Sequence, residues 1–106
     1  VSEQEKHQFI YVSDPVRPET VTDPNSWTEK DTLIFHAHFA SLKQATEEGV
    51  VLLAGRAPDG LGPAVVIFEA ASGSEARQFM EQDPFVAEGL MRASLHPFRA
   101  ALVRKP

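Results

Sequence analysis

The sequence predicts an α+β fold in which strands and helices follow in the order β-α-β-β-α-β. Three observations carry this prediction: two segments with helical spacing of apolar residues, four short runs of β-branched and aromatic residues, and turn-forming residues between them. The chain has 106 residues, 42% of them hydrophobic, which suffices for a single core. We therefore expect residues 1–106 to form one domain, with its folded core at residues 8–105.

The first strand is expected at residues 9–12, because the turn residues 13–15 stop it. Residues 14–27 then form a long Pro-containing loop, and loops of this length are often functional or disordered. Trp27, the only tryptophan, lies at the end of this loop. We expect it to anchor the loop to the domain, with stacking on a ligand as the alternative.

A helical period of apolar residues predicts the first helix over residues 33–48. Thr28 or Ser26 can cap its beginning, where acidic residues also suit the positive end of the helix dipole. Gly49 follows the last periodic residue and is expected to end the helix.

Strands at residues 50–54 and 64–68 flank a Gly-rich turn at residues 56–62 and predict a β-hairpin. Both strands are apolar at consecutive positions, so both faces of the sheet are expected to be apolar, and two helices can cover only one of them. A second copy packed sheet to sheet with two-fold symmetry would cover the other face. Alternatively, the loop at residues 14–27 folds across it.

The second helix is expected over residues 72–82, opened by a Ser-x-x-Glu capping box at Ser72. Asp83 then caps a short helical turn over residues 84–89, and an apolar run predicts the last strand at residues 98–103. This order of elements is that of a ferredoxin-like fold with an antiparallel sheet and one extra helical turn.

Charge and composition exclude several classes of function. The net charge is −5, from 15 acidic and 10 basic residues, and the basic side chains are scattered, so we expect no nucleic-acid partner. No cysteine is present, which excludes disulfides and cysteine zinc sites. Residues 1–7 are polar and no apolar run approaches the roughly 20 residues of a membrane span, so we expect a soluble, cytoplasmic protein.

His38 lies in the middle of the apolar stripe of the first predicted helix, together with Ile34, Leu42 and Ala45. Because imidazole titrates near neutral pH, a histidine that reaches a cavity there can transfer protons. The alternative is a core histidine that donates one hydrogen bond to a carbonyl and has no other role. His36 lies about 200° around the helix, so we expect it in solvent and do not expect the two rings to chelate a metal.

Asp83 before Pro84 is explained by helix capping alone, although its second carboxylate oxygen can still orient an imidazole ring. Tyr11 and Asp14, at the end of the first strand, and Arg56, after the second, are weaker candidates for a pocket. The alternatives are a sheet aromatic, a turn residue and a surface ion pair. The sequence has no phosphate-binding loop and no nucleophile elbow, which leaves proton transfer without metal or cofactor.

Between residues 34 and 103, the order and spacing of four segments resemble the YCII-related family. These segments are HFASL at residues 38–42, EGVVLLAG at 48–55, DPFV at 83–86 and HPF at 96–98. The resemblance implies a ferredoxin-like fold assembled as a dimeric α/β barrel. It also implies a catalytic pair at His38 and Asp83.

Activities attributed to that family include cofactor-free elimination of chloride from hydroxylated aromatic rings. The resemblance therefore implies a lyase or isomerase acting on a small cyclic or aromatic metabolite, and we expect Phe85, Tyr11 and the loop at residues 14–27 to shape the pocket. The chain departs from the family in this longer loop and at Arg56, where many relatives have proline. A non-catalytic module that binds a small ligand or mediates dimerisation is the alternative.

Overall fold

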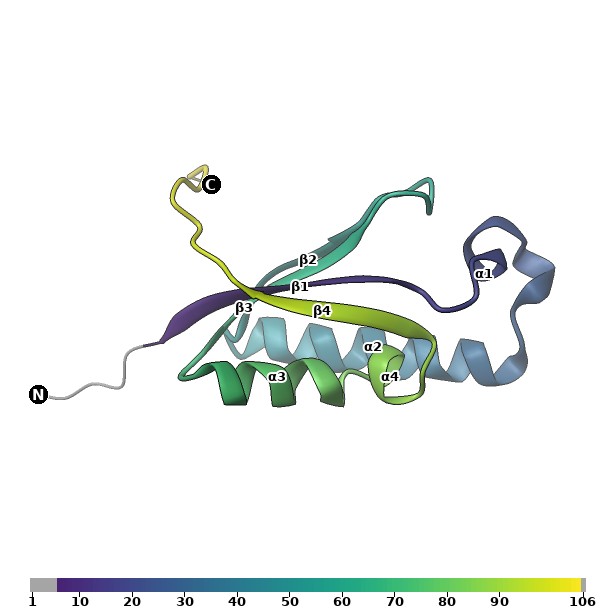
Figure 1. Cartoon of the computed structure of the whole chain (residues 1–106), viewed down its shortest axis with the longest axis horizontal. Coiled ribbons are helices and arrows are strands. Elements are labelled where there is room, and N and C mark those ends of the chain that lie inside the picture. Colours follow the sequence, from purple (N-terminus) through teal and green to yellow (C-terminus); the bar gives the residue numbers. More distant parts are fainter. Residues whose placement is uncertain (1–5, 106) are drawn as a thin grey trace, which may run out of the picture.

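The computed structural model describes residues 6–105, and it arranges them as one layer of sheet and one layer of helices (Figure 1). The antiparallel sheet has the strand order β2-β3-β1-β4. The strands are β1 (His7–Pro15), β2 (Val51–Arg56), β3 (Ala64–Ala70) and β4 (Met91–Pro97), and the helices are α1 (Glu19–Thr22), the 3₁₀ helix η1 (Pro24–Ser26), α2 (Glu29–Glu47), α3 (Gly73–Gln82) and α4 (Pro84–Ala87). The predicted ferredoxin-like α+β fold is confirmed; residues 1–5 and 106 of the expected domain lie outside the described residues.

The segment expected to be a loop, residues 14–27, is instead largely ordered as the end of β1, α1 and η1. β1 continues to Pro15 because its ladder with β4 extends to the pair Pro15 and Met91. Its ladder with β3 ends earlier, at Ser13. A proline is tolerated at such a strand end since it has no N–H to donate. Trp27 anchors the segment as predicted, because its indole N–H donates a hydrogen bond to the carbonyl oxygen of Thr20.

α2 begins at Glu29, earlier than residue 33, where the apolar period starts. Its first turn is polar and is fixed by a capping box: the Thr28 hydroxyl accepts from the Asp31 N–H, and the Asp31 carboxylate accepts from the Thr28 N–H, each at 3.0 Å. Arg17 pairs with the same carboxylate at 2.6 Å. The hydrogen bond from Thr28, with a smaller contribution from Arg17, lowers the pKa of the Asp31 carboxyl, so it is charged at neutral pH. These contacts tie the segment before η1 to the start of α2.

The β2–β3 hairpin and α3 lie where the sequence predicts them. Gly60 in the hairpin turn has a φ of +75°, a conformation that other residues adopt only with strain. At the start of α3, the Ser72 hydroxyl accepts from the Glu75 N–H at 3.1 Å. The Glu75 carboxylate accepts from the Ala71 N–H, not from Ser72, so the expected capping box is only half formed.

The prediction of the last strand at residues 98–103 is wrong, because the fourth strand is β4. β4 alternates apolar and polar residues: Ala93 and Leu95 pack against the core, and the polar residues between them are exposed. The apolar run after β4 contacts β1 only at its beginning, where the Phe98 and Ala100 N–H groups donate to Gln8, and its Leu102 and Val103 are 96% and 77% exposed. Apolar character alone therefore does not identify a strand here.

The core lies between the sheet and the helices α2 and α3. Its buried residues alternate along the strands with residues of the other face, as a pleated sheet requires. They are Phe9, Tyr11, Ala45, Val51, Val66, Phe68, Ala76 and Met80. No helix within residues 6–105 has both the length and the hydrophobicity that crossing a bilayer requires.

The sheet face away from the helices, which we call the open face, is aliphatic in its centre. Register places Leu53, Ile67 and Ile10 in one row across it, with His96 of β4 at the polar edge. Leu53 is 52% exposed. The segment with α1 lies beyond the ends of the strands and does not cross this face (Figure 1), so the alternative in which it covers the sheet is wrong.

Candidate functional site

Asp83 is the residue at which three elements meet. It is the N-cap of α4, directly after α3, and it contacts His38 from α2 and Tyr11 from β1. Pro84 occupies the first position of α4, where its missing N–H costs nothing and its fixed φ suits the helix. The Asp-Pro turn thus places a carboxylate between the helix layer and the sheet, and only 4% of its side chain is exposed.

His38 Nδ1 lies 2.6 Å from Asp83 Oδ1. The imidazole also stacks on the Phe85 ring, with centroids 3.8 Å apart and planes 15° from parallel. Because an ionised carboxylate can only accept, Nδ1 carries the hydrogen in this pair. The neutral ring therefore keeps a free lone pair on Nε2, the state of a general base.

His38 Nε2 has no hydrogen-bond partner among the described residues, whereas every buried side-chain nitrogen and oxygen of that part of the chain has one. Nε2 is therefore accessible to solvent, and 17% of the side chain is exposed. The ring combines a buried, fixed side with a reactive nitrogen at the surface. This differs from a core histidine bonded to a backbone carbonyl.

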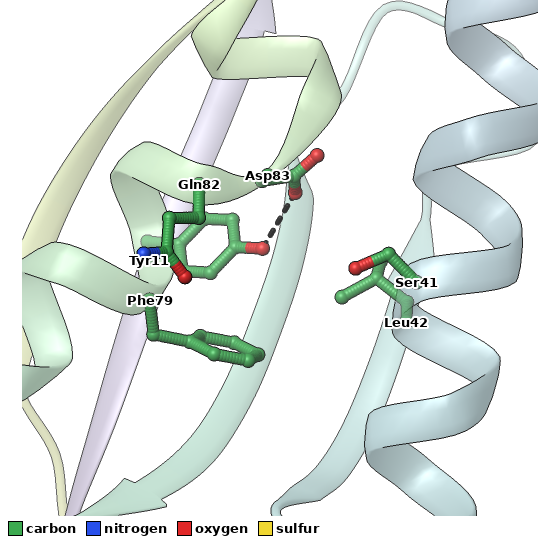
Figure 2. A pocket seen from close by; sticks show the side chains of 6 residues that line it. All are labelled: Tyr11, Ser41, Leu42, Phe79, Gln82 and Asp83. Carbon is green, nitrogen blue, oxygen red and sulfur yellow. Dashed lines mark hydrogen bonds between the residues drawn. The ribbon is translucent and has the colours of Figure 1, made fainter.

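The two oxygens of Asp83 have different partners. Oδ1 accepts both from His38 and from the Phe85 N–H at 3.0 Å, so one oxygen serves the imidazole and the helix cap together. Oδ2 accepts from the Tyr11 hydroxyl at 2.6 Å, the contact that Figure 2 shows as a dashed line. Capping and ring orientation are thus compatible, as expected, but the second oxygen binds Tyr11 and not the imidazole.

Tyr11 is 1% exposed, and its hydroxyl is a fixed donor. Burial, followed by the charge of Asp83 and the hydrogen bond to it, raises the pKa of Tyr11 well above its ordinary value. The phenol therefore stays protonated at all physiological pH values. It holds Asp83 in place and leaves that carboxylate no free oxygen.

A small cavity adjoins Asp83, with a volume of about 60 Å³. Figure 2 shows its lining side chains, which are Tyr11, Ser41, Leu42, Phe79, Gln82 and Asp83. It is much smaller than the roughly 300–1,000 Å³ of typical ligand pockets and has room for a few water molecules. A metabolite that meets His38 must therefore approach Nε2 from outside this cavity.

A larger hollow of about 630 Å³ lies at the other end of the sheet. It is lined by Lys6, His7, Gln8, Phe9, Glu69, Pro97, Phe98 and Arg99. None of the predicted site residues lines this hollow, and its volume alone does not indicate a function.

The structure brings four of the predicted site residues together: His38, Asp83, Tyr11 and Phe85. Asp14 lies elsewhere. It is on the open face, since it is an odd number of residues from the buried Tyr11, and it is 3.9 Å from Arg92 with both side chains 68% exposed.

Arg56, the other predicted pocket residue, lies at the exposed end of β2 and forms no hydrogen bond or ion pair with His38 or Asp83. His36 is exposed, as its position on the helix predicts. Ser41, Leu42, Phe79 and Gln82 line the cavity but are not predicted from the sequence. Helical spacing is the signal that could have found the first two, because they follow His38 by three and four residues.

The fold and the site together define a small α+β protein with a ferredoxin-like sheet and a buried aspartate that orients a histidine. The family model described as YCII-related domain matches residues 16–99, so the chain belongs to the YCII-related family. Among curated proteins, no sequence matches this chain.

Several solved structures resemble the chain, including the following two. One is the 5-chloro-2-hydroxyhydroquinone dehydrochlorinase TftG from Burkholderia phenoliruptrix AC1100, in complex with 2,5-dihydroxybenzoquinone; it has a TM-score of 0.60 and 20% identity, and the match covers 86% of this chain and 93% of that one. The other is a dimeric ferredoxin-like protein from an uncultured marine organism, with a TM-score of 0.39, 7% identity and 96% of each chain covered. The first supports the ferredoxin-like fold.

Proposed function

We propose that this protein is a cofactor-independent enzyme of lyase or isomerase type in which His38 transfers a proton on a small cyclic or aromatic metabolite. One observation carries the proposal: Nδ1 of His38 is held at 2.6 Å by a buried carboxylate while Nε2 is free and accessible. Asp83 fixes the tautomer and orientation of the ring and stabilises its protonated form. Phe85 holds the ring plane by stacking.

The proposed step is removal of a proton from a carbon next to a carbonyl, which in a hydroxylated ring is the carbonyl of its keto tautomer. Nε2 accepts this proton, the carbon–hydrogen bond breaks, and its electron pair forms an enolate. In an isomerisation, the imidazolium returns the proton to another carbon of the same molecule. In an elimination, the electron pair instead expels a leaving group as an anion and forms a double bond. Either outcome balances without a further reactant.

The structural relative TftG supports this class of reaction, because its name is that of a dehydrochlorinase and its bound molecule is 2,5-dihydroxybenzoquinone. A dehydrochlorinase removes hydrogen and chloride from a molecule, which includes loss of a proton. Ring ketones and hydroxylated rings are therefore the first compounds to test.

Proton transfer can be measured without knowing the complete reaction. The protein is incubated in D₂O with a panel of cyclic ketones, lactones and hydroxylated rings, and exchange of carbon-bound hydrogen for deuterium is followed by NMR. We expect catalysed exchange on at least one compound and a loss of about 10²–10⁴-fold in His38→Asn, the usual contribution of a general base.

His36→Asn is the matched control, because His36 is an exposed histidine on the same helix. It should exchange at the wild-type rate. Equal rates in His38→Asn and the wild type would exclude His38 as the base. Binding of a panel compound without exchange would favour the alternative, a non-catalytic module for a small ligand.

We also propose that two copies pack through their open faces into a homodimeric barrel. The aliphatic centre of that face, with Leu53 52% exposed, supports this, since monomers rarely leave a contiguous apolar patch in water. The polar row on β4 would form the rim of the interface, as is usual at protein contacts.

Leu53→Glu should weaken the dimer by about 30-fold or more, the loss of one interface hot spot, because it would bury a charge between the sheets. Sedimentation equilibrium measures this dissociation constant. Leu61→Glu, at a 77% exposed leucine in the hairpin turn, should leave association unchanged. A monomeric wild-type protein, or equal association of Leu53→Glu, would contradict the proposed dimer.

A further inference from the structure

Two phenylalanines on α2 are exposed beside the candidate base. Phe35 and Phe39 are 38% and 59% exposed, and their rings stack with centroids 6.3 Å apart. They lie about 60° and 100° around the helix from His38. The flank on the other side of His38 carries Ser41, which faces the cavity by α3. Phe35 and Phe39 therefore lie on the opposite flank, toward β2, against which α2 packs.

β2 is also exposed where it faces the helix layer. Ala54 pairs with the buried Val66, and Arg56 pairs with Ala64 two residues further along the same face, yet both β2 residues are exposed. The hairpin twists away from α2 at this end of the sheet (Figure 1). The two layers thus part here, and we call this exposed region, with Phe35, Phe39, Ala54 and Arg56, the α2–β2 junction.

The junction is continuous with the catalytic pair. Phe85 stacks on His38 at 3.8 Å, and its centroid lies 6.2 Å from that of Phe35. Arg56 makes no ion pair within residues 6–105 and is free to bind an anion. From strand spacing and rise, the backbone of Arg56 lies about 12 Å from that of Tyr11, whose hydroxyl contacts Asp83. A ring and the arginine side chain together can span this distance.

We propose that the α2–β2 junction binds the substrate of the proposed reaction, and that this substrate is a planar ring bearing an anionic group. The ring packs on Phe35 and Phe39, the guanidinium of Arg56 binds the carboxylate or phenolate, and the ring edge meets Nε2 of His38. This rests on the proposed function for the role of His38 but not for binding. Aromatic faces favour flat rings, and a free guanidinium favours a carboxylate through paired hydrogen bonds.

A small ligand fits this region better than a second copy of the chain does. A second copy can bind the aliphatic open face on the far side of the sheet. That contact would not involve these aromatic rings. The junction instead combines aromatic rings with one unpaired cation, which is complementary to a flat anion. A cation without an opposite charge would be a costly feature in a contact between identical surfaces.

Benzoate is the first probe, with cyclohexanecarboxylate as a non-planar anion and benzamide as a planar neutral molecule. Titration followed by NMR should show saturable binding of benzoate, with the largest changes at the ring signals of Phe35 and Phe39. We expect binding of each of the other two probes to be about tenfold weaker or more.

Paired variants test each half of the proposal. Arg56→Gln should weaken benzoate binding about tenfold or more, whereas Arg92→Gln, at a 68% exposed arginine on the open face, should not. Phe39→Leu should weaken it severalfold, whereas Phe98→Leu, at a phenylalanine beyond β4 that is 39% exposed, should not. His38→Asn should still bind benzoate.

Absence of saturable binding, equal binding of benzamide, or an Arg56→Gln variant that binds as the wild type does would overturn the assignment. So would Phe35 and Phe39 signals that change on dilution of the free protein, because a second copy would then cover the junction. Benzoate binding with no His38-dependent deuterium exchange on any compound would instead refute only the catalytic role. Deuterium exchange at the wild-type rate in Arg56→Gln would refute only the proposed binding site.

Discussion

Asp83→Asn is expected to abolish most deuterium exchange while the protein stays folded. The amide has the shape of the carboxylate, and with its oxygen accepting from the Tyr11 hydroxyl it loses only the cap to the Phe85 N–H, a cost of about 1 kcal/mol. Its nitrogen, however, would donate to His38 Nδ1 and move the ring hydrogen to Nε2, so the base would lose its free lone pair. The same exchange of an orienting aspartate in a serine-protease triad costs about 10⁴ in turnover, and we expect a loss of about 10³–10⁴ here.

The measurement compares exchange rates with the free energy of unfolding in urea. Asp14→Asn is the control, because Asp14 is exposed on the open face and 3.9 Å from its nearest basic group. It should retain the wild-type rate. If Asp83→Asn exchanged within about threefold of the wild type, orientation by this carboxylate would not contribute to the reaction.

Phe68→Ala should give the largest loss of stability. Phe68 is fully buried, and its ring lies 4.6 Å from that of Phe79 and 5.8 Å from that of Tyr11, measured between centroids. Removing it leaves a cavity and costs about 3–5 kcal/mol, out of a total of about 5–15 kcal/mol for a typical domain. Urea unfolding followed by circular dichroism measures this difference.

Phe98→Ala serves as the comparison, because Phe98 is 39% exposed after the end of β4. Its loss should be below about 1 kcal/mol, since little packing is removed. Similar losses for both variants would mean that the core between sheet and helices does not dominate stability. Because Phe68 packs on Tyr11, Phe68→Ala should also slow deuterium exchange.

Most of the fold could be predicted from local sequence patterns, because capping residues, glycines and the period of apolar residues act over a few positions. Thr28, Ser72 and Asp83 cap helices as expected. The last strand could not be located in this way. Its alternating pattern of Ala93 and Leu95 with polar residues is weaker than the apolar run that follows, and only pairing with β1 identifies it.

The His38–Asp83 contact could be predicted in part. His38 is conspicuous because an ionisable ring on an apolar stripe needs a partner. The identity of that partner depends on packing, since Asp83 lies 45 residues away, and Tyr11 donates to the same carboxylate from 72 residues away. No local pattern specifies such distances. The exposure of Phe35 also depends on the twist of the hairpin, which is a property of the whole sheet.

The position of Asp83 links function to cooperativity. A carboxylate that joins an early strand, a central helix and a late helix forms its contacts only when the chain has completed its topology. A partly folded species would contain the same residues but no assembled dyad. The rate of proton transfer should therefore report the population of native molecules directly, and it should vanish in the same transition as the tertiary structure.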